Sequence, residues 1–359
     1  MRVFGVGSDV TQLTLSLFLL GYAVGQLVVG TLSDAVGRRP ALLAGLGVYT
    51  VASLACAVTG NLWLLVTMRF VQGTGAAAGA VIGRAMVRDT HTGAEAARLL
   101  ATMIAVLAIA PMVAPLVGGV LLEHLGWRAI FATLCLCGVA LSAMAASSLE
   151  ETLGERRALS LRAIASGFAL FFGAKETRIP TLLVALSFAG QFAFISGSPF
   201  VIIQGYGVQP AHYGFYFGAT ALALMVGSAS GGRLLKRGRS PQSVVRIGGA
   251  ALMVAAVSLV ALVHLPGTGV FGLIGPMILC FVGIGLVGPS ATAIALDPVP
   301  EIAGSASAII GGVQMIAGSL SGYVVAKIGG ASPTALGWQV AIMAISCAML
   351  AIMPRRGAA

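Results

Sequence analysis

The chain has 359 residues, of which 58% are hydrophobic and only 9% are charged, and its mean hydropathy is +0.99. Soluble domains carry about 25% charged residues, so this composition excludes a water-soluble globular protein and predicts an integral membrane protein. A net charge of +10 would suggest nucleic-acid binding in a soluble chain. In a membrane protein we assign the excess of Lys and Arg to cytoplasmic loops and expect no nucleic-acid partner.

Eleven apolar segments of about 20 residues follow one another, each long enough to cross about 30 Å of hydrocarbon as a helix. They lack the period-two alternation of a membrane β-barrel, so we predict an all-α membrane protein. The predicted spans are Thr11–Leu32, Ala41–Thr59, Leu62–Arg84, Leu99–Leu122, Ala129–Leu149, Ile179–Gln204, Tyr213–Leu235, Val244–Leu265, Val270–Ala295, Ile302–Ala326 and Gly337–Met353.

The longest polar interval, Glu150–Arg178, separates five spans from six. It predicts an N-terminal helical bundle at 1–149, a cytoplasmic central loop at 150–178 and a C-terminal helical bundle at 179–359. Within the interval, Leu161–Gly173 is amphipathic to apolar, which predicts a segment that lies along the membrane surface.

The distribution of basic residues predicts the orientation. Seventeen of the 21 Lys and Arg residues lie in alternate loops, on the same side as the loop Gly30–Pro40, whereas three lie opposite and Arg69 lies within a span. Because basic residues accumulate in cytoplasmic loops, we expect the C-terminus in the cytoplasm and Met1 outside.

The loop Gly30–Pro40 has a second copy at Gly231–Pro241: both read Gly-x6-Gly-Arg-x-Pro, at an offset of 201 residues. Shifting the first five spans by this offset places them on the last five. Ile179–Gln204 is then left over, because its counterpart would lie almost wholly before Met1. We therefore predict two parallel six-helix repeats, a plan of secondary transporters, with the first helix absent.

No pattern of a cofactor, metal or enzyme site is found in the sequence. There is no glycine-rich loop followed by Lys and Ser or Thr that would indicate ATP, and no nucleophile–base spacing. The cysteines lie in apolar runs without metal spacing and are expected to be small core residues. They are Cys56, Cys135, Cys137, Cys280 and Cys347.

Several motifs resemble the major facilitator superfamily. Its motif A is matched by Gly30-x-Leu32-x-Asp34-x-x-Gly37-Arg38-Arg39 and its motif B by Arg69-x-x-Gln72-Gly73-x-Gly75-Ala76-Ala77. The drug:proton antiporter branch is matched by Pro115-x-x-Gly118-Gly119, the end of its motif C, and by Gly126-Trp127-Arg128-x-x-Phe131. Four segments resemble the bicyclomycin/chloramphenicol resistance (Bcr/CflA) efflux family: Gln12–Ser16, Arg84–Asp89, Ile195–Phe200 and Gly304–Ala308. The resemblance covers nearly the whole chain and implies the major facilitator fold and proton-driven export of drugs or small metabolites.

The resemblance implies that the loop Gly30–Pro40 is a gating motif, which would lock the outward-open state on the cytoplasmic side. A carboxylate beside arginines at a helix–loop junction is a charge cluster that can break in another conformation. The alternative is that the arginines only anchor the topology. Where the family usually has a basic residue after the aspartate, this chain has Ala35, which removes one partner of the aspartate. The gating residues are Gly30, Asp34, Gly37, Arg38 and Arg39.

Arg69 is the one basic residue that lies deep within a predicted span, since Arg84, Arg233 and Arg246 lie at the cytoplasmic ends of theirs. A charge there costs about 2.5–3.5 kcal/mol and usually faces a cavity. Arg69 lies about seven residues, roughly 10 Å, from the outer end of its span, so it either acts inside the bundle or extends to the membrane surface. The resemblance implies that Arg69 and Gln72 take part in proton coupling.

Pro111 and Pro115 predict a bend in their span. In the resembling branch, that bend and Gly118–Gly119 are tied to sealing the interface between the halves, whereas the spacing alone predicts a kinked, closely packed helix. Glycines four residues apart predict close helix packing in other spans. They are Gly21 and Gly25; Gly75, Gly79 and Gly83; Gly227 and Gly231; and Gly318 and Gly322.

Polar or aromatic side chains in apolar spans are candidates for a substrate cavity, and such a cavity suits uncharged or lipophilic cargo. Packing or helix–helix hydrogen bonding is an equal alternative for each of them. The candidates are Tyr22 and Gln26, one turn apart, and Gln191, Phe194 and Ser198, on one helix face.

No Asp or Glu lies deep in a predicted span, although a proton antiporter needs a titratable group. In the resembling family the first helix typically carries an acid, so either the start of the chain is placed too late or the protein is degenerate. We predict a monomeric secondary transporter of the bacterial cytoplasmic (inner) membrane, with the lipid bilayer, a small-molecule substrate and protons as partners and no cofactor. The alternatives are a truncated, inactive or non-transporting membrane protein and a metabolite or sugar carrier of the same fold.

Overall fold

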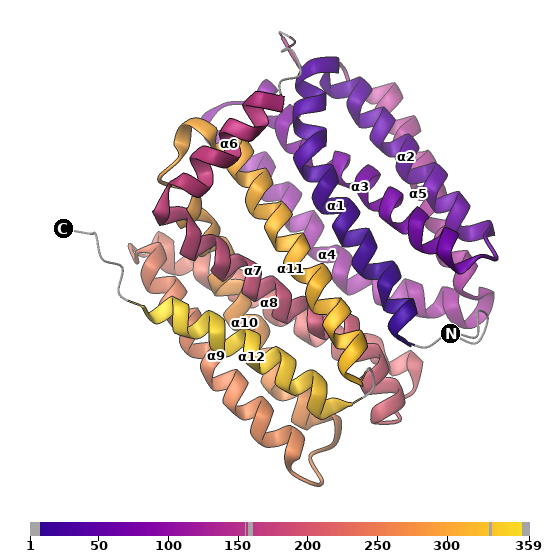
Figure 1. Cartoon of the computed structure of the whole chain (residues 1–359), viewed down its shortest axis with the longest axis vertical. Helices are drawn as coiled ribbons and strands as arrows, with labels where there is room; N and C mark the ends of the chain where they lie inside the picture. Colours follow the sequence, from indigo (N-terminus) through magenta and orange to yellow (C-terminus); the bar gives the residue numbers. More distant parts are fainter. Residues whose placement is uncertain (1–7, 155, 157–160, 330–331, 354–359) are drawn as a thin grey trace. The chain divides into compact units, whose positions relative to one another are not determined.

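The computed structural model describes residues 8–154, 156, 161–329 and 332–353, and within these ranges every regular element is a helix (Figure 1). The long helices are α1 Ser8–Val36, α2 Arg38–Val58, α3 Leu62–Thr90, α4 Gly93–Leu125, α5 Trp127–Ser148, α7 Lys175–Pro199, α8 Pro210–Lys236, α9 Pro241–His264, α10 Gly269–Leu296, α11 Ala303–Gly329 and α12 Pro333–Ile352. Three shorter elements accompany them: α6 Leu161–Gly173, the π-helical turn Phe200–Gly205 after α7, and the 3-10 turn Pro300–Ile302 before α11.

Each of the eleven predicted spans matches one of the long helices, with Ile179–Gln204 running on from α7 into the π-helical turn, so the predicted all-α fold is confirmed. Nine helices of the described part are long and apolar enough to cross a membrane, by length and composition alone. α4 contributes a shorter apolar stretch, Val113–Leu125, and the spanning of α4 and α8 stays a prediction. The amphipathic segment Leu161–Gly173 is helical with the predicted bounds, and its position along the membrane surface stays a prediction.

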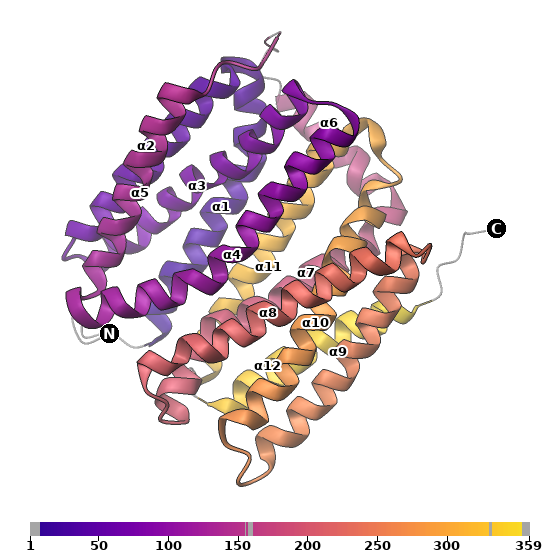
Figure 2. The same ribbon diagram turned by 180° about the vertical axis from the view of Figure 1, so that it is seen from behind.

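The chain divides into two compact units. Unit 1 comprises Met1–Ala169 and Gly304–Ile316, and unit 2 comprises Leu170–Ala303 and Ala317–Ala359. The predicted domain boundaries at 149/150 and 178/179 stay a prediction. In unit 1, α3 packs against α1 and α2, and α2 packs against α5; in unit 2, α10 packs against α7, α8 and α9, and α12 packs against α7 and α9 (Figure 2).

Glycines allow the helices of each unit to cross closely. A Cβ added to Gly21 of α1 would overlap the carbonyl oxygen of Phe70 in α3, and a Cβ on Gly73 of α3 would overlap that of Phe18 in α1. α8 and α10 of unit 2 cross in the same reciprocal way, at Gly227 and Gly285. The repeat seen in the sequence therefore extends to how its helices pack.

The predicted glycine packing is confirmed at some positions and wrong at one. Gly25 lies against the backbone of Thr74, and Gly75 lies against the backbone of Gly45. A Cβ on Gly79 would meet no heavy atom of the described chain within 4 Å. A four-residue spacing marks one helix face, but it does not say which positions on that face meet a neighbour.

The expectation that all five cysteines lie in the core is also wrong. Cys56, Cys280 and Cys347 are buried, Cys135 is half-buried, and Cys137 of α5 is exposed. In a membrane protein an apolar side chain is stable on the lipid-facing surface, so an apolar run does not by itself place a residue in the core.

Candidate functional site

The loop Gly30–Pro40, the predicted gating loop, lies in unit 1, where α1 ends and α2 begins. Arg38, the first residue of α2, is only 8% exposed. Its Nε donates a hydrogen bond to Oδ2 of Asp89 at 2.8 Å, and its Nη1 donates to Oγ of Ser33 at 2.7 Å. The same Nη1 forms an ion pair with Oδ1 of Asp34, four residues earlier. One guanidinium thus joins the end of α1 to the end of α3.

Glu151, in the segment after α5, completes this cluster. Its Oε1 accepts the backbone N–H of Arg38 at 2.8 Å, and its Oε2 accepts that of Arg39 at 3.3 Å. Gly37, between α1 and α2, has a φ of +109°, and a Cβ there would overlap Oε2 of Glu151. A carboxylate at a helix N-terminus satisfies free N–H groups and interacts favourably with the helix dipole.

These contacts predict a pH dependence. The small burial of Glu151 raises its pKa, but the backbone N–H groups of Leu153, Arg38, Arg39 and Thr152 outweigh it, so the pKa is lowered from the ordinary value of 4.5. A lowered pKa stabilises the folded state above pH 4.5, and this contribution disappears as the pH falls through the lowered pKa. Between pH 6 and pH 3, the melting temperature of the purified protein in detergent should therefore fall more for the wild type than for Glu151→Gln. Equal falls of the melting temperature in the two proteins would contradict the lowered pKa of Glu151.

The structure brings together most of the predicted gating residues. Asp34 and Arg38 are paired, and the guanidinium of Arg39 donates to the carbonyl oxygen of Ala146 at 2.6 Å. Sequence reasoning missed Asp89 and Glu151 as partners of this loop. Asp89 lies inside a segment used for the family resemblance, but nothing in its local sequence shows that it faces Arg38.

Arg69, on α3, lies against α1 and α5 in unit 1. Its Nε donates to the carbonyl oxygen of Thr14 at 3.4 Å. Its guanidinium carbon lies 4.3 Å from the ring centroid of Phe18 and 5.7 Å from that of Phe131, so both rings interact with the cation. The guanidinium therefore points into the bundle, which favours action inside the bundle over extension to the membrane surface.

Gln72 links Arg69 to α2. The Nη1 group of Arg69 donates to Oε1 of Gln72, and Nε2 of Gln72 donates to Oγ of Ser53 at 2.6 Å. Gln72 and Ser53 are both fully buried. The predicted pair Arg69 and Gln72 is therefore joined in one buried chain, and its part in proton coupling stays a prediction.

The candidates for the substrate cavity differ between the units. In unit 1, Gln26 is 6% exposed and its Oε1 has no hydrogen-bond partner among the described residues. Gly311 of α11, in the same unit, faces this amide so closely that a Cβ would overlap it. Gln12, also on α1, is buried, and neither of its amide atoms has a hydrogen-bond partner in the part of the chain that the structure describes; our sequence reasoning did not select it. Tyr22 is half-buried one turn before Gln26.

In unit 2, Phe194 and Ser198 are fully buried, and Gln191 is half-buried. Phe194 packs edge-on against Phe281, with ring centroids 5.5 Å apart, and Ser198 shares a hydrogen bond of 2.9 Å with the hydroxyl of Tyr213. These contacts fit the packing alternative for Phe194 and Ser198. A cavity role for the three residues stays a prediction.

α4 carries the predicted interface kink. It is one continuous helix from Gly93 to Leu125, through Pro111 and Pro115. The side chain of Pro111 lies outside the described residues, and Pro115 is half-buried. A Cβ on Gly118 or Gly119 would meet no described atom within 4 Å. The bend and its place at an interface stay predictions.

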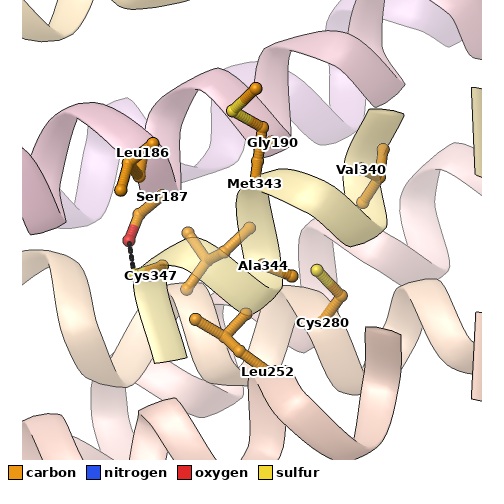
Figure 3. A pocket seen from close by; sticks show the side chains of 10 residues that line it. Leu186, Ser187, Gly190, Leu252, Cys280, Val340, Met343, Ala344 and Cys347 are labelled. Carbon is orange, nitrogen blue, oxygen red and sulfur yellow. Dashed lines mark hydrogen bonds between the residues drawn. The ribbon is translucent and has the colours of Figure 1, made fainter. Parts of the chain in front are cut away.

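A small cavity lies inside unit 2, among α7, α9, α10 and α12 (Figure 3). Its volume is about 10 Å³, and its lining includes Gly190, Leu252, Cys280 and Met343. On its wall, Ser187 and Cys347 form a hydrogen bond of 3.4 Å. Pockets for drug-sized molecules measure about 300–1,000 Å³, and none of the predicted cargo residues lines this one. We therefore interpret it as a packing defect.

This defect predicts a stabilising substitution. A Cβ on Gly190 would lie 3.5 Å from Cβ of Met343, an ordinary contact, and alanine is favoured over glycine within a helix by up to about 1 kcal/mol. Gly190→Ala should therefore raise the melting temperature in detergent. Gly197→Ala, on the same helix, is the matched control, because its Cβ would lie 2.9 Å from Leu336 and 3.0 Å from Val325. A lower melting temperature for Gly190→Ala would contradict the interpretation.

The fold and these sites define a class of protein: a multi-pass helical membrane protein with an arginine held inside a helix bundle and a charged loop between two of its helices. Residues 1–322 match the model of the Major Facilitator Superfamily. The chain therefore belongs to the Major Facilitator Superfamily, whose members are transporters rather than enzymes.

Named relatives confirm the resemblance to drug-resistance transporters. The chain is 32% identical over 361 residues to a chloramphenicol resistance protein of Pseudomonas aeruginosa, covering 98% of this chain and 82% of the relative. It is 30% identical over 331 residues to a bicyclomycin resistance protein homolog of Haemophilus influenzae, covering 90% and 81%. It is 34% identical over 317 residues to an uncharacterized MFS-type transporter, YdgK, of Bacillus subtilis, covering 87% and 78%.

A solved structure supports the fold. A crystal structure of a D-xylose-proton symporter matches with a TM-score of 0.78 at 15% identity, covering 96% of this chain and 87% of that one. At this identity the match shows the fold alone. The major facilitator fold predicted from the motifs is thus confirmed, and the absence of a first helix stays a prediction.

Proposed function

We propose that this protein exports small uncharged or lipophilic drugs or metabolites across the bacterial cytoplasmic membrane by proton antiport. The similarity to relatives named as chloramphenicol and bicyclomycin resistance proteins, over more than four-fifths of their length, carries the proposal. The protein acts as a monomer with its C-terminus in the cytoplasm, the orientation predicted by the distribution of basic residues.

Transport proceeds by alternating access, in which two helical repeats rock about a binding site near the middle of the membrane. The Arg38 cluster at the gating loop stabilises the state that is closed toward the cytoplasm. Arg69 serves the coupling step: it is a cation inside the bundle that forms no ion pair with any carboxylate of the described chain. It is therefore placed to respond to a proton acceptor or an anionic group that enters during the cycle. The amide oxygen of Gln26, which has no hydrogen-bond partner within the described chain, offers an acceptor to cargo.

Inside-out vesicles from a bacterial strain without its own drug pumps test this proposal. Respiration acidifies the vesicle lumen, so a proton antiporter should accumulate labelled chloramphenicol there, and adding the drug should release part of the pH gradient. An uncoupler should abolish both effects. Vesicles without the protein are the control. Uptake that survives the uncoupler, or no uptake of any drug tested, would refute proton-coupled drug export.

A further inference from the structure

Helix α2 begins without a cap of its own. Its N-cap residue is Gly37, which has no side chain to accept the free N–H groups of the first turn. By contrast, Asn61 caps α3 by accepting from the N–H of Trp63 and of Leu64, at 2.8 and 3.2 Å. In α2 this role falls to Glu151, which is 113 residues from Arg38 along the chain.

The loop Gly231–Pro241, the second copy of the gating loop, contains the local helix cap that the first copy lacks. Both loops contain a glycine with positive φ, at Gly37 and Gly238. In the second copy, Ser240 caps α9 by accepting the N–H of Ser243 at 3.2 Å. At the offset of 201 residues, Ser240 corresponds to Arg39 of the first copy. The first loop thus has a charged residue where the second has its cap, and its cap comes from elsewhere in the chain.

The segment that supplies this cap also contacts the Arg38–Asp89 pair. Glu151 accepts the backbone N–H of Arg38, while the hydroxyl of Thr152 donates to Oδ2 of Asp89 at 3.4 Å. That same oxygen accepts from Nε of Arg38. Two successive residues after α5 therefore hold the two members of one ion pair.

We propose that Glu151 is a positioning residue of the gating loop: its carboxylate replaces the missing local cap of α2 and fixes Arg38 where its guanidinium bridges Asp34 and Asp89. The role in gating rests on the proposed transport function, whereas the capping of α2 does not.

A double-mutant cycle tests whether Glu151 acts through Arg38. Glu151→Ala should lower the maximal transport rate about 2- to 30-fold, the factor that corresponds to losing a helix cap of about 0.5–2 kcal/mol, and should change KM less than twofold. If Glu151 and Asp89 both act by placing Arg38, Glu151→Ala combined with Asp89→Asn should be no slower than the slower single variant. Rates that fall by the product of the two single effects would overturn the positioning role.

Hydrogen exchange tests the cap without any transport assay. In Glu151→Ala, the backbone amides of Arg38 and Arg39 should exchange about 2- to 30-fold faster, measured by mass spectrometry on peptides that cover 33–41. Glu150→Ala is the matched control, since the N–H groups of Arg38 and Arg39 are bound by Glu151 and not by this neighbouring glutamate, and it should leave both exchange and transport unchanged. Unchanged exchange in Glu151→Ala would overturn the proposal. A wild type that moves no drug would refute the proposed function, and exchange alone would then decide the capping role.

Discussion

Replacing Arg69 with alanine is expected to slow proton-coupled export strongly while the protein still inserts into the membrane. The guanidinium holds Gln72 and the carbonyl oxygen of Thr14 and lies against the ring of Phe18. A hydrogen bond to a charged group is worth about 1.5–3 kcal/mol, so losing one slows a dependent step about 10- to 100-fold. Insertion should not suffer, because the substitution removes a charge that costs about 2.5–3.5 kcal/mol in the membrane. Drug uptake into inside-out vesicles measures the effect.

Two further variants show whether transport needs the hydrogen bonds of Arg69 or only its positive charge, and whether the loss of any arginine from α3 lowers transport. Arg69→Lys keeps the charge but loses the planar fork of donors that reaches Thr14 and Gln72, so it should transport almost as poorly as Arg69→Ala. Arg88→Ala removes an exposed arginine from the last turn of the same helix and should transport normally. Proton-coupled uptake by Arg69→Ala at the wild-type rate would show that Arg69 only anchors its helix.

The helices were predictable because lipid offers no hydrogen-bond partner to the backbone of a segment that crosses it. A segment that crosses lipid must satisfy its backbone groups internally, so each apolar run from Thr11–Leu32 to Gly337–Met353 had to be a helix, and the structure shows one at each. The bounds of α6 were predictable from the amphipathic to apolar character of Leu161–Gly173. Lipid also limits the prediction: Cys137 belongs to an apolar run as surely as Cys56, yet only Cys56 is buried.

The site was predictable where the chemistry is local. Arg69 and Gln72 lie three residues apart on α3, so their pairing follows from helical spacing. Asp34 and Arg38 lie on either side of Gly37, where α1 ends and α2 begins, so their pairing follows from their closeness in the sequence. Contacts from distant segments, such as Glu151 on Arg38, were not predictable, because hydrophobic periodicity says which residues face inward but not what they meet. This is also why the choice between a cavity role and packing stays open in the sequence for Phe194, which lies fully buried against Phe281.

Replacing Gly73 with alanine is expected to destabilise unit 1 severely. The added Cβ would overlap the carbonyl oxygen of Phe18 and lie 2.8 Å from the backbone nitrogen of Tyr22. Both atoms belong to the backbone of α1, which cannot rotate away as a side chain would, so α1 and α3 must separate. Overpacking usually costs about 1–3 kcal/mol, and separating two helices would also disturb the contacts of Arg69 with α1. The melting temperature and the monodisperse fraction in detergent should both fall.

Gly79→Ala is the matched control for this prediction, because it makes the same change on the same helix. Gly79 is exposed, and its Cβ would meet no described atom within 4 Å, so this variant should gain up to about 1 kcal/mol from the higher helix propensity of alanine. Helix propensity alone would make both variants equally stabilising, whereas close packing of α1 on α3 makes their effects opposite in sign. A Gly73→Ala protein as stable as Gly79→Ala would show that α1 and α3 do not cross at these glycines.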